Sequence, residues 1–278
     1  MSLTSTTTLH NGVKLPWLGL GVYKVEKGFE VEQTVKTALN LGYRSIDTAS
    51  FYENEEGVGK ALSESGIKRE DLFITTKVWN SQQGYDNTIK AFNESLEKLK
   101  LDYVDLYLVH WPVPGKYKDT YRALEDLYEQ GKVRAIGVSN FQIHHLEDLM
   151  NDAKIKPMVN QVEFHPQLFQ EDLLQFCKQN DIQLEAWGPL ARGNYLDDPA
   201  LTEIATKYNK TTAQVILRWD YQHGVVTIPK STKIKRQEEN ANIFDFTLTD
   251  EDMNRIDALN QNKRTGKHPD EFDYSPYL

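Results

Sequence analysis

The chain has 278 residues, of which 39% are hydrophobic and 26% charged, and its 41 Asp and Glu outweigh its 32 Lys and Arg to give a net charge of −9. This length fits one large α/β barrel or two ordinary domains. The negative charge argues against a general nucleic-acid surface, so an anionic ligand would need a local basic site.

Cys177 is the only cysteine, which excludes an intramolecular disulfide. No stretch approaches the roughly 20 apolar residues that span a bilayer, and the N-terminal residues lack the basic and apolar regions of a signal peptide. We expect a soluble cytoplasmic protein, a monomer, with no membrane or nucleic-acid partner.

Two short strands at residues 6–9 and 13–15 flank a His10-Asn11-Gly12 turn, a pattern that predicts a β-hairpin. From Trp17 onward, short apolar strands alternate with segments that carry helical spacing. Strands are expected at residues 17–20, 43–46, 72–78, 104–109, 133–138, 158–163, 182–187 and 225–228, and helices at residues 30–41, 54–65, 85–98, 120–129, 144–151, 171–179, 199–208, 211–223, 233–242 and 250–259.

Eight strand–helix units of this kind favour a parallel sheet that is covered on both faces. Because no Pro-, Ser- or Gly-rich linker interrupts them, we predict a single domain over residues 1–278. Its expected fold class is α/β, a (β/α)8 TIM barrel with an N-terminal β-hairpin. An open doubly wound sheet is the alternative, but no strand runs into a Gly-x-Gly-x-x-Gly turn. Gly57 and Gly59 lie inside a predicted helix, where they indicate close helix packing.

Four polar residues follow the ends of the second, third and fourth barrel strands: Asp47, Tyr52, Lys77 and His110. Each has an ordinary structural explanation, as a helix cap, a core aromatic, a lysine that reaches water and a core histidine. Because the carboxyl ends of neighbouring barrel strands face one mouth, a single site explains the four together better than four coincidences.

The four residues would form a coherent acid–base site. A free phenol has a pKa near ~10, and the Lys77 ammonium should lower the pKa of Tyr52, while Asp47 holds the ammonium charged. Tyr52 could then donate a proton at neutral pH. The imidazole of His110 could orient a substrate carbonyl, and a group that protonates a carbonyl oxygen requires something that attacks the carbonyl carbon.

At these residues the chain resembles the aldo-keto reductase family, and most closely the bacterial glyoxal/methylglyoxal reductase or 2,5-diketo-D-gluconate reductase type. The resemblance covers nearly the whole chain. It rests on Leu18-Gly19-Leu20-Gly21, Gly42-Tyr43-Arg44-Ser45-Ile46-Asp47-Thr48-Ala49, Tyr52, Asn54, Thr76-Lys77, Leu108-Val109-His110-Trp111-Pro112, Ile136-Gly137-Val138-Ser139-Asn140-Phe141, Asn160-Gln161-Val162-Glu163, Gly188-Pro189-Leu190 and Ile228-Pro229-Lys230-Ser231. It implies that Asp47, Tyr52, Lys77 and His110 are the catalytic tetrad, with Tyr52 as the proton donor.

The resemblance also implies that NADPH lies across the barrel mouth. Ser139, Asn140 and Gln161 match positions that hydrogen-bond the nicotinamide carboxamide, although Ser139-Asn140 could also cap the helix that follows. Trp187 stands where an aromatic residue, commonly Tyr, stacks on the nicotinamide, and the change to Trp keeps the flat ring but removes a hydroxyl. The further cofactor positions are Gly21, Val22, Gly188, Pro189, Leu190 and Ile228.

The one concentrated basic stretch, residues 230–236, directly follows the eighth strand. It could be a solvated helix start, but barrels often hold a phosphate at this point, and helix N-terminal amides with a guanidinium suit a 2′-phosphate. The resemblance assigns the phosphate to Lys230, Ser231, Thr232 and Arg236, and the adenine to Glu239 and Asn240.

No metal site is predicted. The chain has no His-Glu-x-x-His or Cys-x-x-Cys spacing, and the adjacent His144 and His145 are expected to point in different directions on a helix. His165 is interpreted as structural.

We therefore predict an NADP-dependent oxidoreductase that reduces small aldehydes, dicarbonyls and ketones to alcohols. The apolar walls of its substrate pocket would be Tyr23, Trp79 and Trp111, and the short loops around them predict an open mouth and broad specificity. Two alternatives stay open. A barrel aldolase would form a Schiff base on Lys77 and need a neutral amine there, and a nucleotide-sensing subunit would bind NADPH with negligible turnover.

Overall fold

A ring of eight parallel strands forms the centre of the computed structural model, which describes residues 2–278. The strands follow one another in chain order: β3 (Leu20–Gly21), β4 (Ser45–Asp47), β5 (Phe73–Val78), β6 (Val104–Val109), β7 (Val133–Ser139), β8 (Val159–Glu163), β9 (Gln183–Trp187) and β10 (Val226–Thr227). The first and last strands meet, because the Gly19 amide donates to the Thr227 carbonyl at 3.0 Å and the Thr227 amide donates to the Trp17 carbonyl at 3.0 Å. The sheet is thus a closed barrel, and the open-sheet alternative is wrong.

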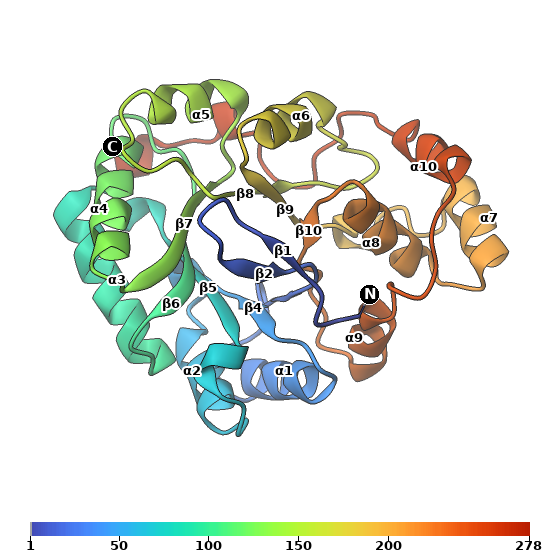
Figure 1. The fold of residues 1–278 in the computed structure, drawn as a ribbon, viewed down its shortest axis with the longest axis horizontal. Helices are drawn as coiled ribbons and strands as arrows, with labels where there is room; N and C mark the ends of the chain where they lie inside the picture. The colour runs from blue at the N-terminus through green and yellow to red at the C-terminus, as the bar shows by residue number, and fades with distance from the viewer. Residues whose placement is uncertain (1) are drawn as a thin grey trace.

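Helices surround the barrel on the outside (Figure 1). They are α1 (Phe29–Asn40), α2 (Glu55–Ser63), α3 (Tyr85–Leu99), α4 (Tyr117–Glu129), α5 (Ile143–Met150), α6 (Glu171–Gln179), α7 (Pro199–Tyr208), α8 (Thr212–Gln222), α9 (Ile234–Ala241) and α10 (Asp250–Asp257). Short 3₁₀ helices, which the periodicity did not predict, lie in the connections: η1 (Ser50–Tyr52), η2 (Arg69–Asp71), η3 (Asn80–Gln82), η4 (Ala191–Gly193), η5 (Pro269–Glu271) and η6 (Ser275–Tyr277). The predicted (β/α)8 fold is confirmed.

The predicted hairpin is also confirmed, as β1 (Thr6–Thr8) paired antiparallel with β2 (Lys14–Pro16). It lies across one end of the barrel (Figure 1). The Thr7 hydroxyl donates to Gln183 Oε1 at 3.1 Å, and Asn11 Nδ2 donates to the Arg134 carbonyl at 2.9 Å. Because Gln183 and Arg134 stand at the beginnings of β9 and β7, the hairpin closes the amino-terminal end and leaves the carboxyl-terminal end for chemistry.

The predicted strand at residues 17–20 differs most from the structure. Only Leu20 and Gly21 pair with β4, whereas Trp17 to Gly19 face β10 through the bonds that close the barrel. Gly19 also lies against β4, where a Cβ atom would come within 2.9 Å of the Ser45 hydroxyl. The first strand is therefore divided between its two neighbours.

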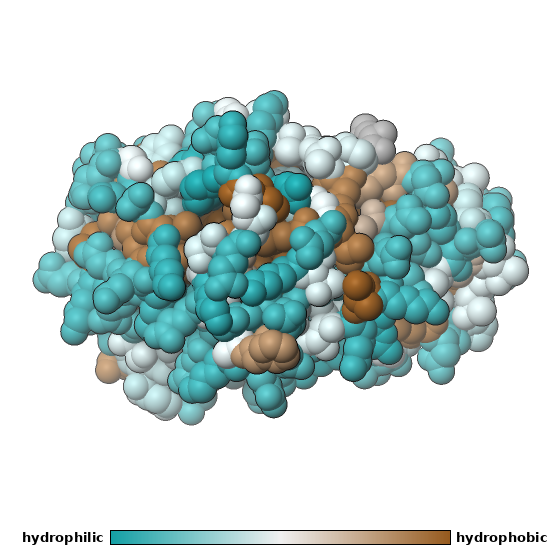
Figure 2. All heavy atoms as spheres, turned by 90° about the horizontal axis from the view of Figure 1, so that it is seen from below, coloured by the Kyte–Doolittle hydropathy of each residue, from teal (hydrophilic) through white to brown (hydrophobic). Residues whose placement is uncertain are grey.

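Gly57 and Gly59 let α2 pack closely on its neighbours, as predicted. A Cβ atom at Gly57 would lie 2.4 Å from Cγ1 of Val31 in α1, and one at Gly59 would lie 2.5 Å from the carbonyl oxygen of Leu99 in α3. On the face in Figure 2 hydrophilic residues predominate, and some apolar residues are exposed among them. Within residues 2–278, no helix is long and apolar enough to cross a membrane.

The Gly59 contact predicts the effect of one added methyl group. Gly59→Ala should lower the free energy of unfolding by about 1–3 kcal/mol, because the obstacle is the backbone of Leu99, which cannot move aside like a flexible side chain. Urea denaturation followed by circular dichroism measures the change. Ser63→Ala, at an exposed position of the same helix, is the control and should stay within about 0.5 kcal/mol of the wild type. An unchanged Gly59→Ala protein would contradict the packing argument.

Candidate active site

Lys77, Asp47 and Tyr52 meet at the carboxyl-terminal end of the barrel. Lys77 Nζ lies 2.7 Å from Asp47 Oδ1, 2.9 Å from the carbonyl oxygen of Thr48 and 3.3 Å from the Tyr52 hydroxyl. The three contacts match the three protons of an ammonium group. The Lys77 side chain has 0% exposed surface and that of Asp47 4%, so the ion pair is buried at the bottom of the mouth.

The turn that carries Tyr52 is held on two sides. The Ser50 hydroxyl donates to the Lys77 carbonyl at 3.1 Å, which ties η1 to β5. Asn54 Nδ2 donates to the Val22 carbonyl at 3.0 Å, which ties the start of α2 to the loop after β3. These bonds fix the Tyr52 ring beside Lys77 and 5.0 Å, between ring centroids, from Tyr23.

His110 follows β6 and completes the predicted tetrad. Its ring centroid lies 5.8 Å from that of Tyr52 and 5.0 Å from that of Trp79, both nearly perpendicular to it. Its Nδ1 atom is buried without a hydrogen-bond partner among residues 2–278. Burial, aided by the Lys77 charge, holds the pKa of His110 well below its usual range. The ring is therefore a neutral imidazole at neutral pH.

Burial and the neighbouring charges set the protonation of the other two groups. Burial acts to lower the pKa of Lys77, but the Asp47 carboxylate and Tyr52 outweigh it, so the pKa is raised and the ammonium persists. Burial raises the pKa of Tyr52 to about 12, against the opposing effect of Lys77. The expectation of a net lowering for Tyr52 is thus wrong, because the cost of burying a phenolate exceeds the gain from Lys77. Tyr52 keeps its proton through neutral pH.

Asn140 and Trp187 join the tetrad from β7 and β9. Asn140 Nδ2 donates to the His110 carbonyl at 2.9 Å, and the indole Nε1 of Trp187 donates to Asn140 Oδ1 at 2.8 Å. The change to tryptophan therefore supplies a hydrogen bond of its own. The Ser139 hydroxyl donates to the Gln161 carbonyl at 2.8 Å. Neither Ser139 nor Asn140 caps the next helix, since the N-cap of α5 is Gln142.

Glu185, which the sequence did not single out, lies under this group. Gln161 Nε2 is 2.8 Å from Asp47 Oδ2 and 2.8 Å from Glu185 Oε2. Glu185 is 1% exposed. Burial, and then the Asp47 charge, raises the pKa of Glu185 to about 8. A second carboxyl group, neutral at neutral pH, thus shares one amide with the carboxylate of the tetrad.

The residues predicted to line a cofactor groove lie at the ends of the neighbouring strands. A Cβ atom at Gly21 would lie 2.9 Å from the Ile228 carbonyl oxygen, so only glycine allows these two loops to touch. Val22 is buried, and Gly188 has a φ of 61° directly after β9. Pro189 is buried and Leu190 half-buried.

The basic segment leads from β10 into α9. Gln237 Nε2 donates to the Ser231 carbonyl at 2.8 Å, which fixes the turn before the helix. Lys230 and Arg236 are exposed, Thr232 and Glu239 are half-buried, and Ser231 and Asn240 are buried. In the part of the chain that the structure describes, Arg236 has no ion-pair partner, so its guanidinium at the start of the helix is available to an anion. Among residues 2–278, no hydrogen bond or ion pair joins this segment to the tetrad.

More aromatic rings gather near His110 and Trp111 than the predicted Tyr23, Trp79 and Trp111. Phe51 stacks on Trp79 with ring centroids 3.8 Å apart. The C-terminal tail adds Phe272, 4.6 Å from Trp111, and Tyr277, 5.9 Å from Trp79. The signal for Phe51 was its place beside Tyr52. The aromatic residues of the tail stand in an otherwise polar segment, which gave no indication of where they fold.

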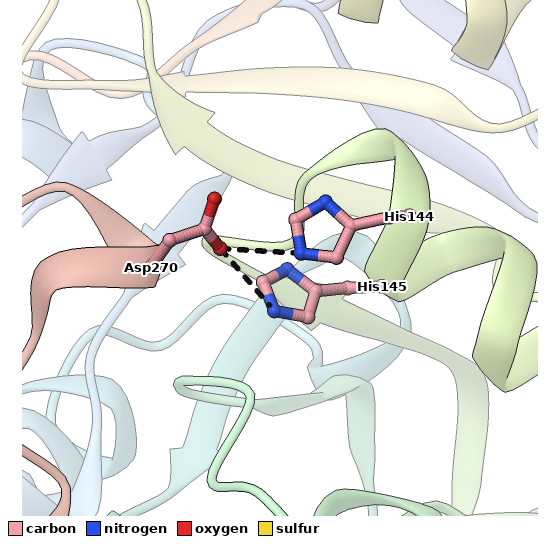
Figure 3. A group of neighbouring side chains, drawn as sticks. All are labelled: His144, His145 and Asp270. Carbon is pink, nitrogen blue, oxygen red and sulfur yellow. Dashed lines mark ion pairs between the residues drawn. The ribbon is translucent and has the colours of Figure 1, made fainter.

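His144 and His145 converge, so the expectation that they diverge is wrong (Figure 3). Their Nε2 atoms lie 3.2 Å and 3.5 Å from Asp270 Oδ1 in the tail. The reason is local, because the Gln142 amide donates to His145 Nδ1 at 3.1 Å and turns that ring toward the tail. Since Nδ1 accepts a hydrogen bond there, the Nε2 atom of neutral His145 carries the ring proton and faces Asp270 as a donor. A metal ion bound by His145 at this point would require the hydrogen bond between Gln142 and His145 to break. The geometry therefore favours a structural role, in which the two histidines hold the C-terminal tail through Asp270.

The tail is held at a second point by Glu163. The Gly266 amide donates to Glu163 Oε2 at 3.1 Å, and His165 Nε2 lies 3.1 Å from Glu163 Oε1. His165 is fully buried, which agrees with a structural role. A Cβ atom at Gly266 would come within 2.5 Å of the Trp187 ring. The tail therefore fixes Trp187 from one side.

Comparison with known proteins agrees with this geometry. Residues 18–261 match the model of the Aldo/keto reductase family. The glyoxal reductase of Bacillus subtilis (strain 168) is 65% identical over 271 residues, which are 98% of each chain. The structure of MGS-M4, an aldo-keto reductase enzyme from a Medee basin deep-sea metagenome library, is 48% identical with a TM-score of 0.93 and covers 97% of this chain and 100% of that one. A mutant of Gox0644 in complex with NADPH is 42% identical with a TM-score of 0.92, over 96% and 98% of the two chains.

The buried imidazole yields a prediction that needs no ligand. At about pH 6, where an ordinary histidine is mostly protonated, His110 should remain neutral. In Lys77→Met its pKa should rise relative to the wild type, because one of the two causes of its depression is removed. Ring ¹⁵N shifts in NMR spectra, with a histidine-containing model peptide as the reference, measure both values. A His110 that titrates like the peptide would contradict the site geometry.

Proposed function

The chain belongs to the aldo/keto reductase family, and we propose that it reduces small aldehydes, dicarbonyls and ketones to alcohols with Tyr52 as the proton donor. It is an NADP-dependent oxidoreductase that acts on carbonyl compounds and uses NADPH. The observation that carries the finer proposal is the hydrogen bond of the buried Lys77 ammonium to the Tyr52 hydroxyl, beside a neutral His110.

The residues around the mouth fit a dinucleotide. Asn140, Ser139 and Gln161 offer polar atoms to the carboxamide, and Trp187 offers a flat ring next to them. Ser231 and Thr232 lie in the turn before α9 and Arg236 lies in its first turn, where amides and a guanidinium suit a phosphate. The further positions proposed to line the groove are Gly21, Val22, Gly188, Pro189, Leu190, Ile228, Lys230, Glu239 and Asn240. When bound, NADPH supplies a hydride from its nicotinamide ring to the carbonyl carbon.

The chain's own residues handle the proton. Tyr52 donates the proton of its hydroxyl to the carbonyl oxygen, and the phenolate left behind is stabilised by Lys77, 3.3 Å away. Asp47 keeps Lys77 charged and oriented. His110, as a neutral imidazole, donates a hydrogen bond that aligns the carbonyl. Solvent then returns a proton to Tyr52.

The two alternatives meet different difficulties. A Schiff base requires a neutral Lys77, but this amine is an ammonium whose three protons face Asp47, Thr48 and Tyr52. A nucleotide-sensing subunit would not need the acid–base group. Substrate-dependent consumption of NADPH separates it from an enzyme.

The aromatic walls favour small substrates. Phe51 stacks on Trp79, and the tail rings Tyr277 and Phe272 contact Trp79 and Trp111 and each other. These rings offer apolar contact and few polar groups that could select one substrate. We propose that carbonyl reactivity governs turnover more than shape does, and the glyoxal reductase relative supports small dicarbonyls as the class.

The test of the function is loss of NADPH absorbance with a panel of small aldehydes, glyoxal-type dicarbonyls and keto-sugars. Tyr52→Phe should lower kcat by about 10²-fold or more, the range of general-acid catalysis, while the Kd for NADPH changes little. Tyr103→Phe, near the closed end of the barrel, is the matched control and should keep wild-type kcat. Near-full reduction of a plain aldehyde by Tyr52→Phe would refute the proton-donor role. Tight NADPH binding without turnover on any substrate would favour the sensor.

The basic segment predicts cofactor preference. A charged contact to phosphate contributes roughly 1.5–3 kcal/mol, so Arg236→Ala should weaken NADPH about tenfold or more and leave NADH nearly unchanged. Fluorescence titration with both cofactors measures this. Lys235→Ala, on the same turn, is the control because that lysine faces Glu239 at 4.0 Å. Equal losses for NADPH and NADH in Arg236→Ala would remove the 2′-phosphate assignment.

A further inference from the structure

We propose that Glu185 is a positioning residue that fixes the side-chain amide of Gln161 with its oxygen presented to the nicotinamide end of NADPH. This inference rests on the proposed function, because it assigns a role in binding the cofactor. It adds to the tetrad a carboxyl group that acts through another residue and touches no reacting atom itself.

The barrel brings the three side chains together from two sides. Gln161 and Glu185 are direct partners in the pairing of β8 with β9, whereas Asp47 ends β4 on the other side of the ring. The Gln161 amide spans the interior between the two carboxyl groups, at 2.8 Å from each. Asp47 and Glu185 are both at least 97% buried, with 3% and 1% of their surfaces exposed.

Only one orientation of the Gln161 amide satisfies these contacts. The atom between the carboxyl oxygens must donate to both, and the NH2 group has two protons while the amide oxygen has none. Both protons are thereby used, and among residues 2–278 the Oε1 atom of Gln161 has no hydrogen-bond partner. Without Glu185 one proton would be free, and the amide could rotate toward other partners. The Asp47 carboxylate, which can only accept, requires the NH2 group at this point, and Glu185 holds the second proton, so that the amide plane is fixed and its oxygen points to the cofactor.

Three charged or titratable groups determine the charge around the Gln161 amide: Asp47 from β4, Lys77 from β5 and Glu185 itself from β9. With Glu185 neutral, Asp47 alone pairs with Lys77. As the pH rises through the raised pKa of Glu185, a second negative charge forms under the ring site. That charge should favour the cationic ring of NADP⁺ over the neutral ring of NADPH. The ratio of the dissociation constants for NADP⁺ and NADPH therefore reports whether Glu185 is ionised.

The experiment measures Kd for NADPH and NADP⁺ by quenching of tryptophan fluorescence. Glu185→Leu removes the acceptor and should weaken NADPH roughly three- to tenfold, the value of one hydrogen bond, whereas Glu185→Gln retains an acceptor and should stay within about twofold. In a Gln161→Ala background, Glu185→Leu should add less than about twofold, because the residue through which it acts is gone.

The pH dependence gives a second readout that a merely structural role would not change. Between about pH 6.5 and 9.5, the ratio Kd(NADP⁺)/Kd(NADPH) should fall in the wild type and stay flat in Glu185→Gln. Asp220→Asn removes another buried carboxyl group, one that accepts from the Thr227 hydroxyl, and as the control it should keep the wild-type slope.

Two results would overturn the inference: equal losses from Glu185→Leu with and without Gln161, or a wild-type slope in Glu185→Gln. If Glu185→Leu does not fold, the slope of Glu185→Gln decides alone. A wild type that binds no NADPH would instead refute the proposed function, so the two failures can be told apart.

Discussion

A lysine ammonium with no exposed surface is the constraint on which the site depends. Removing two charges from water costs several kcal/mol per ion, and this cost is offset only if every proton of the ammonium finds an acceptor. Lys77 satisfies that condition with Asp47, the Thr48 carbonyl and the Tyr52 hydroxyl. The requirement fixes the register of β4 against β5 and the path of the turn that follows. The geometry of the candidate site and the local stability of the barrel thus depend on the same set of contacts.

The two ends of the barrel are covered by different segments of the chain. At one end the hairpin covers the strand beginnings through Thr7 and Asn11, and no tetrad residue lies there. At the other end a tail returns across the mouth and is tied to Glu163 and to the histidine pair of α5. Segments from both extremes of the chain therefore complete a core that the strand–helix units alone would leave open.

The fold was predictable because its signals are local. Short apolar strands, helical spacing and the residues at strand ends indicated the barrel and grouped Asp47, Tyr52, Lys77 and His110. The side-chain contacts between strands on opposite sides of the barrel were not predictable in this way. Glu185 alternates with Leu184 and Ala186 in its strand, and nothing in that pattern shows that it faces Asp47 across the barrel. The net pKa shift of Tyr52 depends on how deeply the ring is buried, and the direction of His145 depends on Gln142 and the tail, so neither could be obtained from spacing.

The closure between Gly19 and Thr227 bears on how the protein is made. These residues lie near opposite ends of the chain, so during synthesis the first strand must wait for nearly the whole polypeptide before its second neighbour arrives. Until then it presents an unpaired edge, which in larger proteins invites association between chains. The division of this strand into two short pairings limits the hazard, since only Leu20 and Gly21 belong to a regular ladder. Completion of the barrel, and with it the close contact between Gly21 and Ile228, therefore requires synthesis of the chain beyond β10.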